Sequence, residues 1–442
     1  MSARSSHLLI SLSLLSVISA CAADEAPPQP DVVLIVMDTT RQDHIGPFSE
    51  ENSSGPFFEK LAAQSMLFEN AWTASSWTAP SSATIHTGLH PQRHGLLQCL
   101  WAQVGPPPEG AKVQDILAKV DLVAMPSGVQ TLGEHLAQAG YRGIGVAANP
   151  NICEELGFAR GFESFTLKND VGTEELIQRF HAAKSEEETS RPLFAYFHLN
   201  DPHAPYQRHE EHCPHLEDGS ECIFNCWYQS EIDFVGAQLG SLFDEMGWWE
   251  GAVIVLVNDH GEEFGEHGQI GHRFSLHPEV CRAPLMISAP GLTPRRTSLP
   301  AHQVDILPTV LDLVGLPQPE LGDGMNLTGI TDASQHKERP ILSHRSEPRS
   351  GKELWSLLIG DWRLTDEQPT GTLTLFNISE DPSEQVELAD AHPEKAAAMS
   401  ERLNAIRASL SPLPRNKVQV DLTYRLNMEL QRLGYVGGEE DE

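Results

Sequence analysis

The chain has 442 residues, 40% of them hydrophobic, and carries 62 acidic against 30 basic residues. This length and composition suit one large α/β domain with an appendage and exclude a disordered chain. The formal net charge of -32 excludes nucleic acid as a partner, because phosphate backbones bind to basic faces. An anionic substrate is repelled by the same charge, so it requires a local cation, and a metal site becomes part of any such prediction.

The N-terminus has the layout of an export signal. Arg4 precedes an apolar run from Leu8 to Ile18, which is too short to span a bilayer as a helix. The order Ile-Ser-Ala-Cys ending at Cys21 resembles a bacterial lipobox, and cleavage by the ordinary signal peptidase is the alternative. We therefore expect residues 1–21 to be a lipoprotein signal peptide with a lipidated cysteine and residues 22–30 to be a tether. The protein would then be lipid-anchored in a bacterial cell envelope, facing the periplasm or the cell surface.

Short apolar runs then alternate with helix-like segments, and this order predicts an α/β fold with a large, mostly parallel central sheet covered on both faces. Several runs are apolar throughout, as strands buried on both faces are. The expected strands are Val32 to Met37, Gly143 to Ala148, Leu193 to His198, Ala252 to Asn258 and Pro284 to Ala289. The expected helices, with apolar residues at helical spacing, are Thr131 to Ala139, Ile232 to Phe243 and Val304 to Val314.

From about Ile341 onward the runs become shorter and more polar, which predicts a small C-terminal α+β subdomain. Its expected strands include Leu354 to Ile359 and Thr372 to Phe376, and a helix is expected around Pro393 to Ile406. The predicted domains are therefore a main domain over 31–340, a subdomain over 341–436 that completes the fold, and a solvated acidic tail over 437–442.

The cysteines that remain after Cys21 are six, an even number that permits disulfides in an exported chain. Cys213, Cys222 and Cys226 are clustered. A disulfide is favoured there over a zinc knot with nearby histidines, because the spacing fits no four-ligand zinc pattern and the compartment is oxidising. Six thiols allow about fifteen complete pairings, so the sequence leaves the connectivity open.

Two of the expected strands run directly into potential metal ligands. Asp38 follows the first strand, and Asp259 and His260 follow the strand that ends at Asn258. In open α/β sheets, ligands bind beyond the carboxyl ends of the strands. Carboxylates and imidazole suit a hard or borderline divalent ion. Each residue alone is explained equally well as a helix cap or a turn former, but together they predict a metal site.

A threonine follows Trp77 at the start of the segment Thr-Ala-Pro-Ser-Ser-Ala-Thr. Pro80 suits the first position of a helix, and a hydroxyl at a helix N-terminus faces a site that favours anions. Thr78 would then sit where a tetrahedral sulfuryl or phosphoryl group is stabilised. A simple helix cap is the alternative for this threonine.

Six stretches, in chain order, resemble the motifs of sulfatase-like hydrolases of the alkaline phosphatase superfamily. Asp38 to Gly46 is similar to the family's Asp-Thr-x-Arg-x-Asp-His-x-Gly, and Thr87 to Gly95 to its Thr-Gly-x-x-Pro-x-x-His-Gly. The others are Asp201 to Tyr206, Asp259 to His272, Val304 to Asp312 and Leu433 to Gly437. The resemblance spans almost the whole mature chain and implies a three-layer, alkaline phosphatase-like sandwich with residues 31–340 as the catalytic domain.

The resemblance also implies roles for the matching residues. Asp38, Thr78, Asp259 and His260 would bind one divalent metal ion, whose identity among Ca, Mg, Mn and Zn is left open. A second ion is an alternative, to which Asp201, His203 and His272 could contribute. His203 would contact the ester oxygens and act in catalysis. His272 and, on the substrate side, His267 are the weaker candidates for protonating the leaving group.

The chain departs from the sulfatase pattern at the nucleophile. True sulfatases carry a cysteine or serine that is oxidised to formylglycine, followed by an arginine, and here Thr78 and Ser82 occupy these positions. Oxidation of a secondary alcohol gives a ketone, so formylglycine is not expected. A threonine resembles the superfamily's phosphotransferases and phosphodiesterases, in which an alkoxide attacks phosphorus. Asn149 lies where the family has a lysine-histidine motif, and it is a candidate hydrogen-bond donor to substrate.

The sequence therefore predicts a metal-dependent hydrolase or transferase with Thr78 as nucleophile, and phosphate esters are slightly preferred. The substrate would be a small-molecule, glycan-linked or lipid-linked sulfate or phosphate ester, and the only membrane contact would be the lipid anchor. Two alternatives are a sulfuric ester hydrolase with an unconventional mechanism and an inactive binding pseudoenzyme. An inert surface lipoprotein would leave the ordered metal ligands and His203 unexplained.

Overall fold

The computed structural model describes residues 29–49, 52, 54–104, 119–169, 171–185, 190–212, 223–330, 332–347 and 350–421. The expected signal peptide with Cys21, the clustered Cys213 and Cys222, the closing motif from Leu433 and the acidic tail lie outside these residues and stay predictions. In the part of the chain that is described, none of the helices has the length and apolar character needed to cross a membrane.

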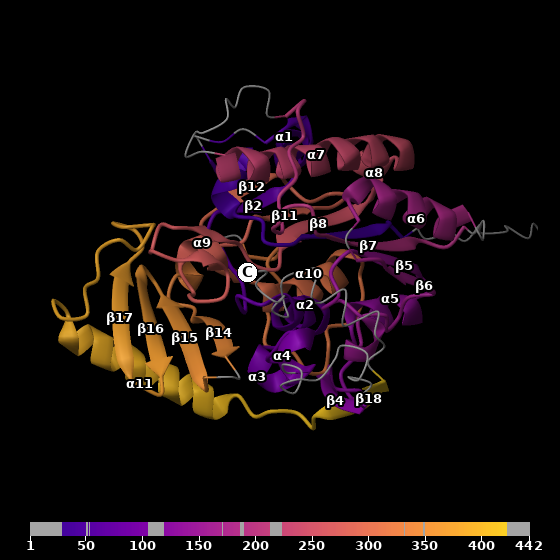
Figure 1. The fold of residues 1–442 in the computed structure, drawn as a ribbon. Helices are drawn as coiled ribbons and strands as arrows, with labels where there is room; N and C mark the ends of the chain where they lie inside the picture. The colour runs from indigo at the N-terminus through magenta and orange to yellow at the C-terminus, as the bar shows by residue number, and fades with distance from the viewer. Residues whose placement is uncertain are drawn as a thin grey trace, which may run out of the picture.

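An eight-stranded sheet forms the centre of the main domain, with the strand order β12-β2-β11-β8-β1-β7-β5-β6 (Figure 1). The strands β8, β1, β7, β5 and β6 run parallel to one another, whereas β11 runs antiparallel to both β8 and β2. The expected mostly parallel sheet is confirmed. The bounds are β1 Val32–Met37, β2 Met66–Phe68, β5 Arg142–Ala147, β6 Ser164–Leu167, β7 Leu193–Leu199, β8 Val253–Asn258, β11 Leu285–Ser288 and β12 Arg295–Thr297.

Helices cover both faces of this sheet, as Figure 1 shows. In β1, Val32, Leu34 and Val36 belong to one hydrophobic core and Val33, Ile35 and Met37 to the other, which explains why the strand is apolar throughout. The first core includes residues of α2 Thr78–Thr87, α5 Leu132–Gln138 and α10 Ile306–Leu313. The second includes residues of α1 Pro56–Ala63, α6 Thr173–Ser185, α7 Ile223–Met246 and α8 Trp248–Gly251.

The C-terminal part is an antiparallel four-stranded sheet in the order β14-β15-β16-β17 with one long helix, α11, packed on it. Met399 and Leu403 of this helix share a core with Leu357 and Leu364 of the sheet, and Figure 1 shows α11 crossing the strands. The expected small α+β region is thus present. The bounds are β14 Ile341–Glu347, β15 Lys352–Ile359, β16 Trp362–Gln368, β17 Thr372–Asn377 and α11 Pro393–Ser409.

After α11 the chain returns to the main domain, where β18 Asn416–Asp421 pairs antiparallel with β4 Lys119–Ala124. The remaining elements are short. The strands are β3 Ala71–Trp72, β9 Glu263–Phe264, β10 Ile270–Gly271 and β13 Ala301–His302. The helices are α3 Pro91–His94, α4 Leu100–Val104, α9 Pro278–Cys281 and the 3-10 turns η1 Gln42–His44, η2 Gly46–Phe48, η4 Glu154–Leu156, η5 Gln303–Asp305 and η6 Ala333–His336.

Two helix starts differ from the sequence expectation. α7 begins at Ile223 rather than Ile232. α2 begins at Thr78, so that Pro80 occupies its third position instead of its first; proline is tolerated there because the first turn has no intrahelical partner for its N–H. Trp77 is the N-cap residue, and no side chain caps this helix, so the simple cap alternative for Thr78 is not supported.

The described cysteines fall into two groups. Cys226, a member of the expected cluster, is disulfide-bonded, in line with the preference for a disulfide over a zinc knot. Cys99, Cys153 and Cys281 are free and buried. Burial raises the pKa of each of these three thiols to between about 11 and about 12, so they are packing residues and weak nucleophiles.

Candidate active site and metal centre

Two aspartates lie side by side at the carboxyl edge of the central sheet. β1 and β8 pair in parallel with Met37 opposite Asn258, so the residues that follow, Asp38 and Asp259, emerge together. Both side chains are fully buried. The sequence expectation that these strand ends converge therefore holds, since parallel neighbours place their carboxyl ends at one edge.

The ligand atoms of these aspartates and of His260 converge. Among the residues that the structure describes, Asp38 Oδ1 and Asp259 Oδ2 have no hydrogen-bond partner. The Nδ1 atom of His260 is 3.0 Å from the Gly261 carbonyl oxygen, and its Nε2 atom is 3.6 Å from Asp259 Oδ2 and 4.0 Å from Asp38 Oδ1. The three residues each offer an atom within 4.8 Å of the others. Orphaned, buried carboxylate oxygens are unfavourable, so this donor set fits a divalent cation.

Thr78 completes the group. Its Oγ1 atom is 3.3 Å from His260 Nε2, and the residue is buried. As the first residue of α2, it stands at the positive end of the helix dipole. The structure thus brings together four residues that are far apart in the sequence: Asp38, Thr78, Asp259 and His260.

The backbone around these ligands is constrained at two points. Thr39 has φ 51°, a left-handed conformation that is costly for a β-branched residue. Two hydrogen bonds stabilise this conformation. The Thr39 amide donates to Asp259 Oδ1 at 3.2 Å, and the Thr39 hydroxyl donates to the Pro202 carbonyl at 2.7 Å. At Gly261, a Cβ atom would lie 2.0 Å from the Glu279 carbonyl oxygen, so only glycine fits after His260.

The other oxygen of Asp38 is held by two side chains. Asn149 Nδ2 donates to Asp38 Oδ2 at 2.5 Å, and His198 Nε2 lies 3.4 Å from the same atom. Burial alone would raise the pKa of Asp38, but the hydrogen bond with His198 and the charges of His203 and His260 bring this pKa well below its ordinary value. Asp38 is therefore held as a carboxylate, the form that binds a cation.

Asn149, a candidate substrate donor in the sequence, is engaged within the protein. Its amide nitrogen also donates to Asn200 Oδ1 at 3.1 Å, and its oxygen accepts from the Asn151 amide at 2.9 Å. This geometry points to a residue that orients Asp38. His198 was not foreseen, because it continues the apolar strand β7; its only sequence signal is the period-2 spacing that puts it on the same face as Tyr196, whose hydroxyl is 3.0 Å from His198 Nδ1.

His272 stands next to the ligand group. Its ring centroid is 4.4 Å from that of His260, and its Nε2 atom is buried without a partner. Its Nδ1 atom is 3.1 Å from Glu262 Oε1, and Tyr206 donates to Glu262 Oε2 at 3.1 Å. Burial and the neighbouring His260 lower the pKa of His272 to about 4, so the imidazole is neutral and able to accept a proton at Nε2.

His203 lies at the wall of a cavity of about 490 Å³ beside this group, which His272, Glu262 and Tyr206 also line. The His203 and His272 ring centroids are 5.5 Å apart, and His203 Nδ1 is 2.7 Å from the Ala204 carbonyl oxygen. The outer wall is apolar, with Ile270 74% and Phe274 51% exposed. A second cavity of about 390 Å³ also reaches His203.

Two other sequence candidates lie away from the ligand group. His267, expected on the substrate side, stacks on His277 with ring centroids 3.6 Å apart and forms part of a separate cluster with Glu263. Asp201, an alternative ligand for a second ion, accepts hydrogen bonds from the Thr173 amide and hydroxyl at 3.0 and 2.7 Å. Its carboxylate therefore fixes the start of α6.

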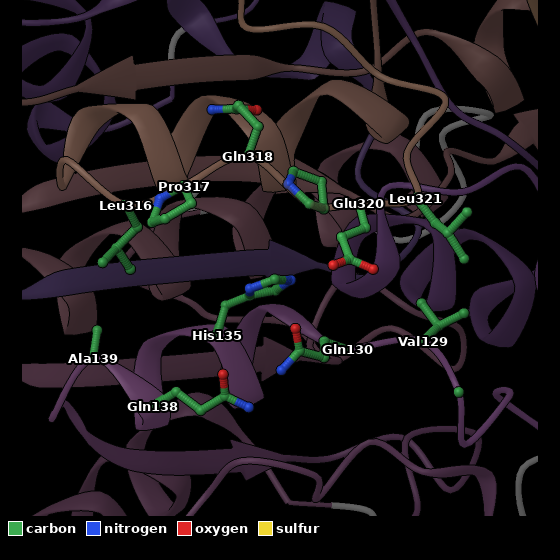
Figure 2. A pocket seen from close by; sticks show the side chains of 12 residues that line it. Val129, Gln130, His135, Gln138, Ala139, Leu316, Pro317, Gln318, Glu320 and Leu321 are labelled. Carbon is green, nitrogen blue, oxygen red and sulfur yellow. The ribbon is translucent and has the colours of Figure 1, made fainter.

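A further pocket of about 400 Å³ is lined by no residue of this group (Figure 2). Figure 2 shows His135 and Gln138 of α5 on one side and the segment Leu316 to Leu321 after α10 on the other. Its lining residues include no serine, threonine or cysteine and no candidate metal cluster. In both respects it differs from the group at the ends of β1 and β8.

Comparisons with known proteins agree with this architecture. A family model described as Sulfatase matches residues 30–316. The choline-sulfatase of Rhizobium meliloti (strain 1021) is 21% identical over 453 residues, which cover 82% of this chain and 83% of the relative. Among solved structures, the phosphonate monoester hydrolase of Agrobacterium radiobacter superimposes with a TM-score of 0.66 at 16% identity, covering 86% of this chain and 96% of that one. A structure described as a complex with its substrate D-glucosamine-2-N,6-O-disulfate gives a TM-score of 0.67 at 15% identity, covering 86% and 97%.

Proposed function

Because the chain belongs to the sulfatase family, a family of ester hydrolases, we propose that it cleaves a phosphate or sulfate monoester or diester with Thr78 as the nucleophile. The observation that carries this proposal is the position of Thr78 Oγ1, 3.3 Å from His260 Nε2, next to the two unpartnered carboxylate oxygens of Asp38 and Asp259. A hydroxyl in this position faces a buried group of ligand atoms that fits a divalent cation and, through the cation, an anionic group.

The metal ligands in this proposal are Asp38, Asp259, His260 and Thr78. A divalent cation held by them would supply positive charge that lowers the pKa of an alcohol and offsets the charge of the transferred group. The same positive charge would offset the repulsion between an anionic substrate and a chain with a net charge of -32. Asn149 and His198 hold Asp38 in place, and Gly261 lets the chain after His260 pass close to the Glu279 carbonyl.

The reaction has two displacement steps. Thr78 Oγ1 forms a bond to phosphorus or sulfur while the bond to the ester oxygen breaks, and the leaving alcohol takes up a proton. Water then attacks the same atom and gives up a proton, which passes to Thr78 Oγ1 as the bond to Thr78 breaks. The products are the threonine hydroxyl and free phosphate or sulfate, or a phosphate monoester when the substrate is a diester. Neutral His272 is suited to accept the Thr78 proton at Nε2 and return it to the leaving group, since Glu262 fixes its ring.

His203 is proposed to contact the ester oxygens, because it lines the cavity next to His272. The remainder of the substrate would occupy the cavity of about 490 Å³ and lie against Phe274 and Ile270 at its exposed rim. This apolar wall suits an ester with an aromatic or aliphatic group at least as well as a bare sugar. Small-molecule, glycan-linked and lipid-linked esters all remain within the proposal.

Phosphate is preferred over sulfate on the chemistry of one side chain. Thr78 cannot become formylglycine, and Ser82, where the sulfatase pattern has an arginine, leaves its buried hydroxyl without a partner. An alkoxide nucleophile then attacks the ester directly, as in phosphoryl transfer. Likeness to a phosphonate monoester hydrolase at the level of the fold is compatible with this preference, and sulfuryl transfer by the same hydroxyl is the second candidate.

The test is turnover of matched aryl phosphate, aryl phosphodiester and aryl sulfate esters by the full-length protein, with and without chelation and re-addition of Ca, Mg, Mn or Zn. We expect metal-dependent turnover of at least one phosphoester, its loss in Thr78→Ala, and partial retention in Thr78→Ser. Thr370→Ala, in an exposed hairpin, is the control. Full turnover by Thr78→Ala would exclude Thr78 as nucleophile, and a folded, metal-loaded protein that cleaves no ester would favour the pseudoenzyme.

The envelope location is a separate proposal that rests on the sequence around Cys21. Expression in a bacterial host with labelled fatty acid should label the wild type and leave Cys21→Ser unlabelled. Release of an unlabelled wild-type protein into the periplasm would instead indicate ordinary signal-peptide cleavage.

A further inference from the structure

A second group of metal-binding side chains lies beyond β8, on the hairpin formed by β9 and β10 and at the start of α9. The imidazole rings of His267 and His277 stack with centroids 3.6 Å apart and planes 8° from parallel. Glu263 lies beside them, and the three residues each offer a ligand atom within 4.8 Å of the others. None of the three belongs to the group around Thr78.

Each imidazole of this cluster is paired with a carboxylate through one ring nitrogen. His267 Nε2 is 3.2 Å from Glu279 Oε2, and His277 Nδ1 is 2.9 Å from Glu384 Oε2. Metal-binding histidines nearly always donate their second N–H to such a group, which fixes the ring and its tautomer. Glu384 is itself fixed, because Arg363 donates to its other oxygen at 2.7 Å. A carboxylate therefore fixes the orientation of each ring, as it does for metal-binding histidines.

Glu263 supplies an independent observation. The residue is 0% exposed, and neither carboxylate oxygen has a hydrogen-bond partner of ordinary geometry among the described residues. A buried carboxylate without partners is strongly unfavourable. A cation between Glu263 and the two imidazoles would satisfy these oxygens.

We propose that Glu263, His267 and His277 bind a second divalent cation, with Zn²⁺ as the preferred ion. Two imidazoles and one carboxylate are a ligand set that zinc favours, and a fourth position can be filled by water. Ca²⁺ and Mg²⁺ prefer oxygen ligands and should compete poorly.

The ion would have a structural role. It would tie the β9–β10 hairpin to the segment that begins α9 and, through Glu384, to the C-terminal part of the chain. Glu262 precedes Glu263 directly, and His272 follows β10, so the same hairpin carries the pair placed beside the proposed nucleophile. His267 is then a zinc ligand, and its substrate-side role in the sequence prediction is set aside.

The experiment separates this ion from the one proposed at Asp38. Full-length wild type, Asp259→Asn, and Asp259→Asn combined with His267→Ala are stripped with a chelator, reloaded with zinc, desalted and analysed for metal content. We expect Asp259→Asn to keep about one tightly bound zinc per chain and the double variant to keep none. His135→Ala, in the separate pocket of Figure 2, is the matched control and should bind as much zinc as the wild type.

Glu263→Gln provides a second variant that keeps the shape of the side chain if His267→Ala folds poorly. In the Asp259→Asn background, zinc should raise the melting temperature, and adding Glu263→Gln should remove this rise. Equal zinc content with and without His267→Ala, together with an unchanged zinc-induced rise in Glu263→Gln, would overturn the proposal. Equal zinc content in the wild type and Asp259→Asn, together with zinc loss in the double variant, would support this second site and count against the proposed catalytic ion.

Discussion

The amide nitrogen of Asn149 lies 2.5 Å from Asp38 Oδ2, on the side of the carboxylate opposite to its unpartnered oxygen Oδ1. The hydrogen bond fixes the plane of the carboxylate and so directs Oδ1 toward Asp259 and His260. Residues that orient metal ligands affect affinity nearly as strongly as the ligands themselves. The position of Asn149 therefore leads to a prediction that differs from that for a substrate donor.

Asn149→Ala should weaken binding of the divalent ion by about 10- to 100-fold, the effect that is typical when a residue that orients a metal ligand is removed. Titration of the chelated protein with Mn²⁺, followed calorimetrically, measures this constant. Asn404→Ala, on the exposed face of α11, should leave it unchanged. Unaltered ion affinity with a raised KM would return Asn149 to the role of substrate donor.

Glu262→Gln should slow turnover by about 100-fold or more, because His272 loses the carboxylate that fixes its ring. The charge and hydrogen bond of Glu262 raise the pKa of His272 against the lowering effects of burial and His260. Without the charge and hydrogen bond of Glu262, the pKa of His272 falls further. The acidic limb of the pH dependence of kcat should therefore move to lower pH. Tyr206→Phe removes only the hydrogen bond to Glu262 Oε2 and should have a smaller effect. An unshifted acidic limb in Glu262→Gln would show that His272 does not control it.

The convergence of Asp38 and Asp259 could be predicted from the sequence because strand ends carry a strong local signal. An apolar run that stops at Asp38 or at Asp259 marks the carboxyl edge of a parallel sheet, and that topology brings distant residues together. The proposed nucleophile required the resemblance as well, since a threonine near a proline is an ordinary helix start. Motifs placed Thr78 in the right order, and the structure puts its hydroxyl next to His260.

The residues that orient the ligands could not be predicted in this way. His198 lies within an apolar strand, and its contact with Asp38 depends on the β1–β7 register, in which Val36 is opposite His198. His267 lies in the same motif as His260, but the β9–β10 hairpin turns it toward His277. Side-chain direction after a turn depends on tertiary packing, which short-range patterns do not carry.

Arg363→Met should destabilise the protein by about 3–5 kcal/mol, because it removes the guanidinium that pairs with the buried Glu384 and leaves only His277 beside this carboxylate. Arg363 and Glu384 are 1% and 3% exposed, and the guanidinium also contacts the Leu276 carbonyl and the Trp72 ring. The matched control is Lys337→Met, which breaks the exposed pair with Asp361 and should change stability very little, because solvent screens such a pair. Urea unfolding gives both values. If the two variants are equally stable, the buried pair does not hold the C-terminal sheet on the main domain.

Acidification should destabilise the protein through two buried histidines, His86 of α2 and His94 of α3. His86 packs between Tyr196 and Phe158 with ring centroids 4.7 and 5.7 Å away, and burial lowers its pKa from 6.5 to about 3. Burial lowers the pKa of His94 to about 3 in the same way. The unfolded chain binds a proton at each site below pH 6.5 and the folded chain does not, so stability is complete above pH 6.5 and falls as the pH decreases toward 3.

Each of the two histidines should contribute about 1.4 kcal/mol per pH unit to this loss. His86→Gln removes the contribution of one histidine to this pH dependence. The free energy of unfolding of this variant should therefore fall less steeply between pH 6 and pH 4 than that of the wild type, even if it is lower at pH 7. The comparison of slopes, obtained by urea unfolding at several pH values, separates protonation from lost packing. His392→Gln, at an exposed position before α11, should leave the slope unchanged. Parallel pH dependences for the wild type and His86→Gln would mean that His86 is protonated equally in the folded and unfolded states, which its enclosure among aromatic rings argues against.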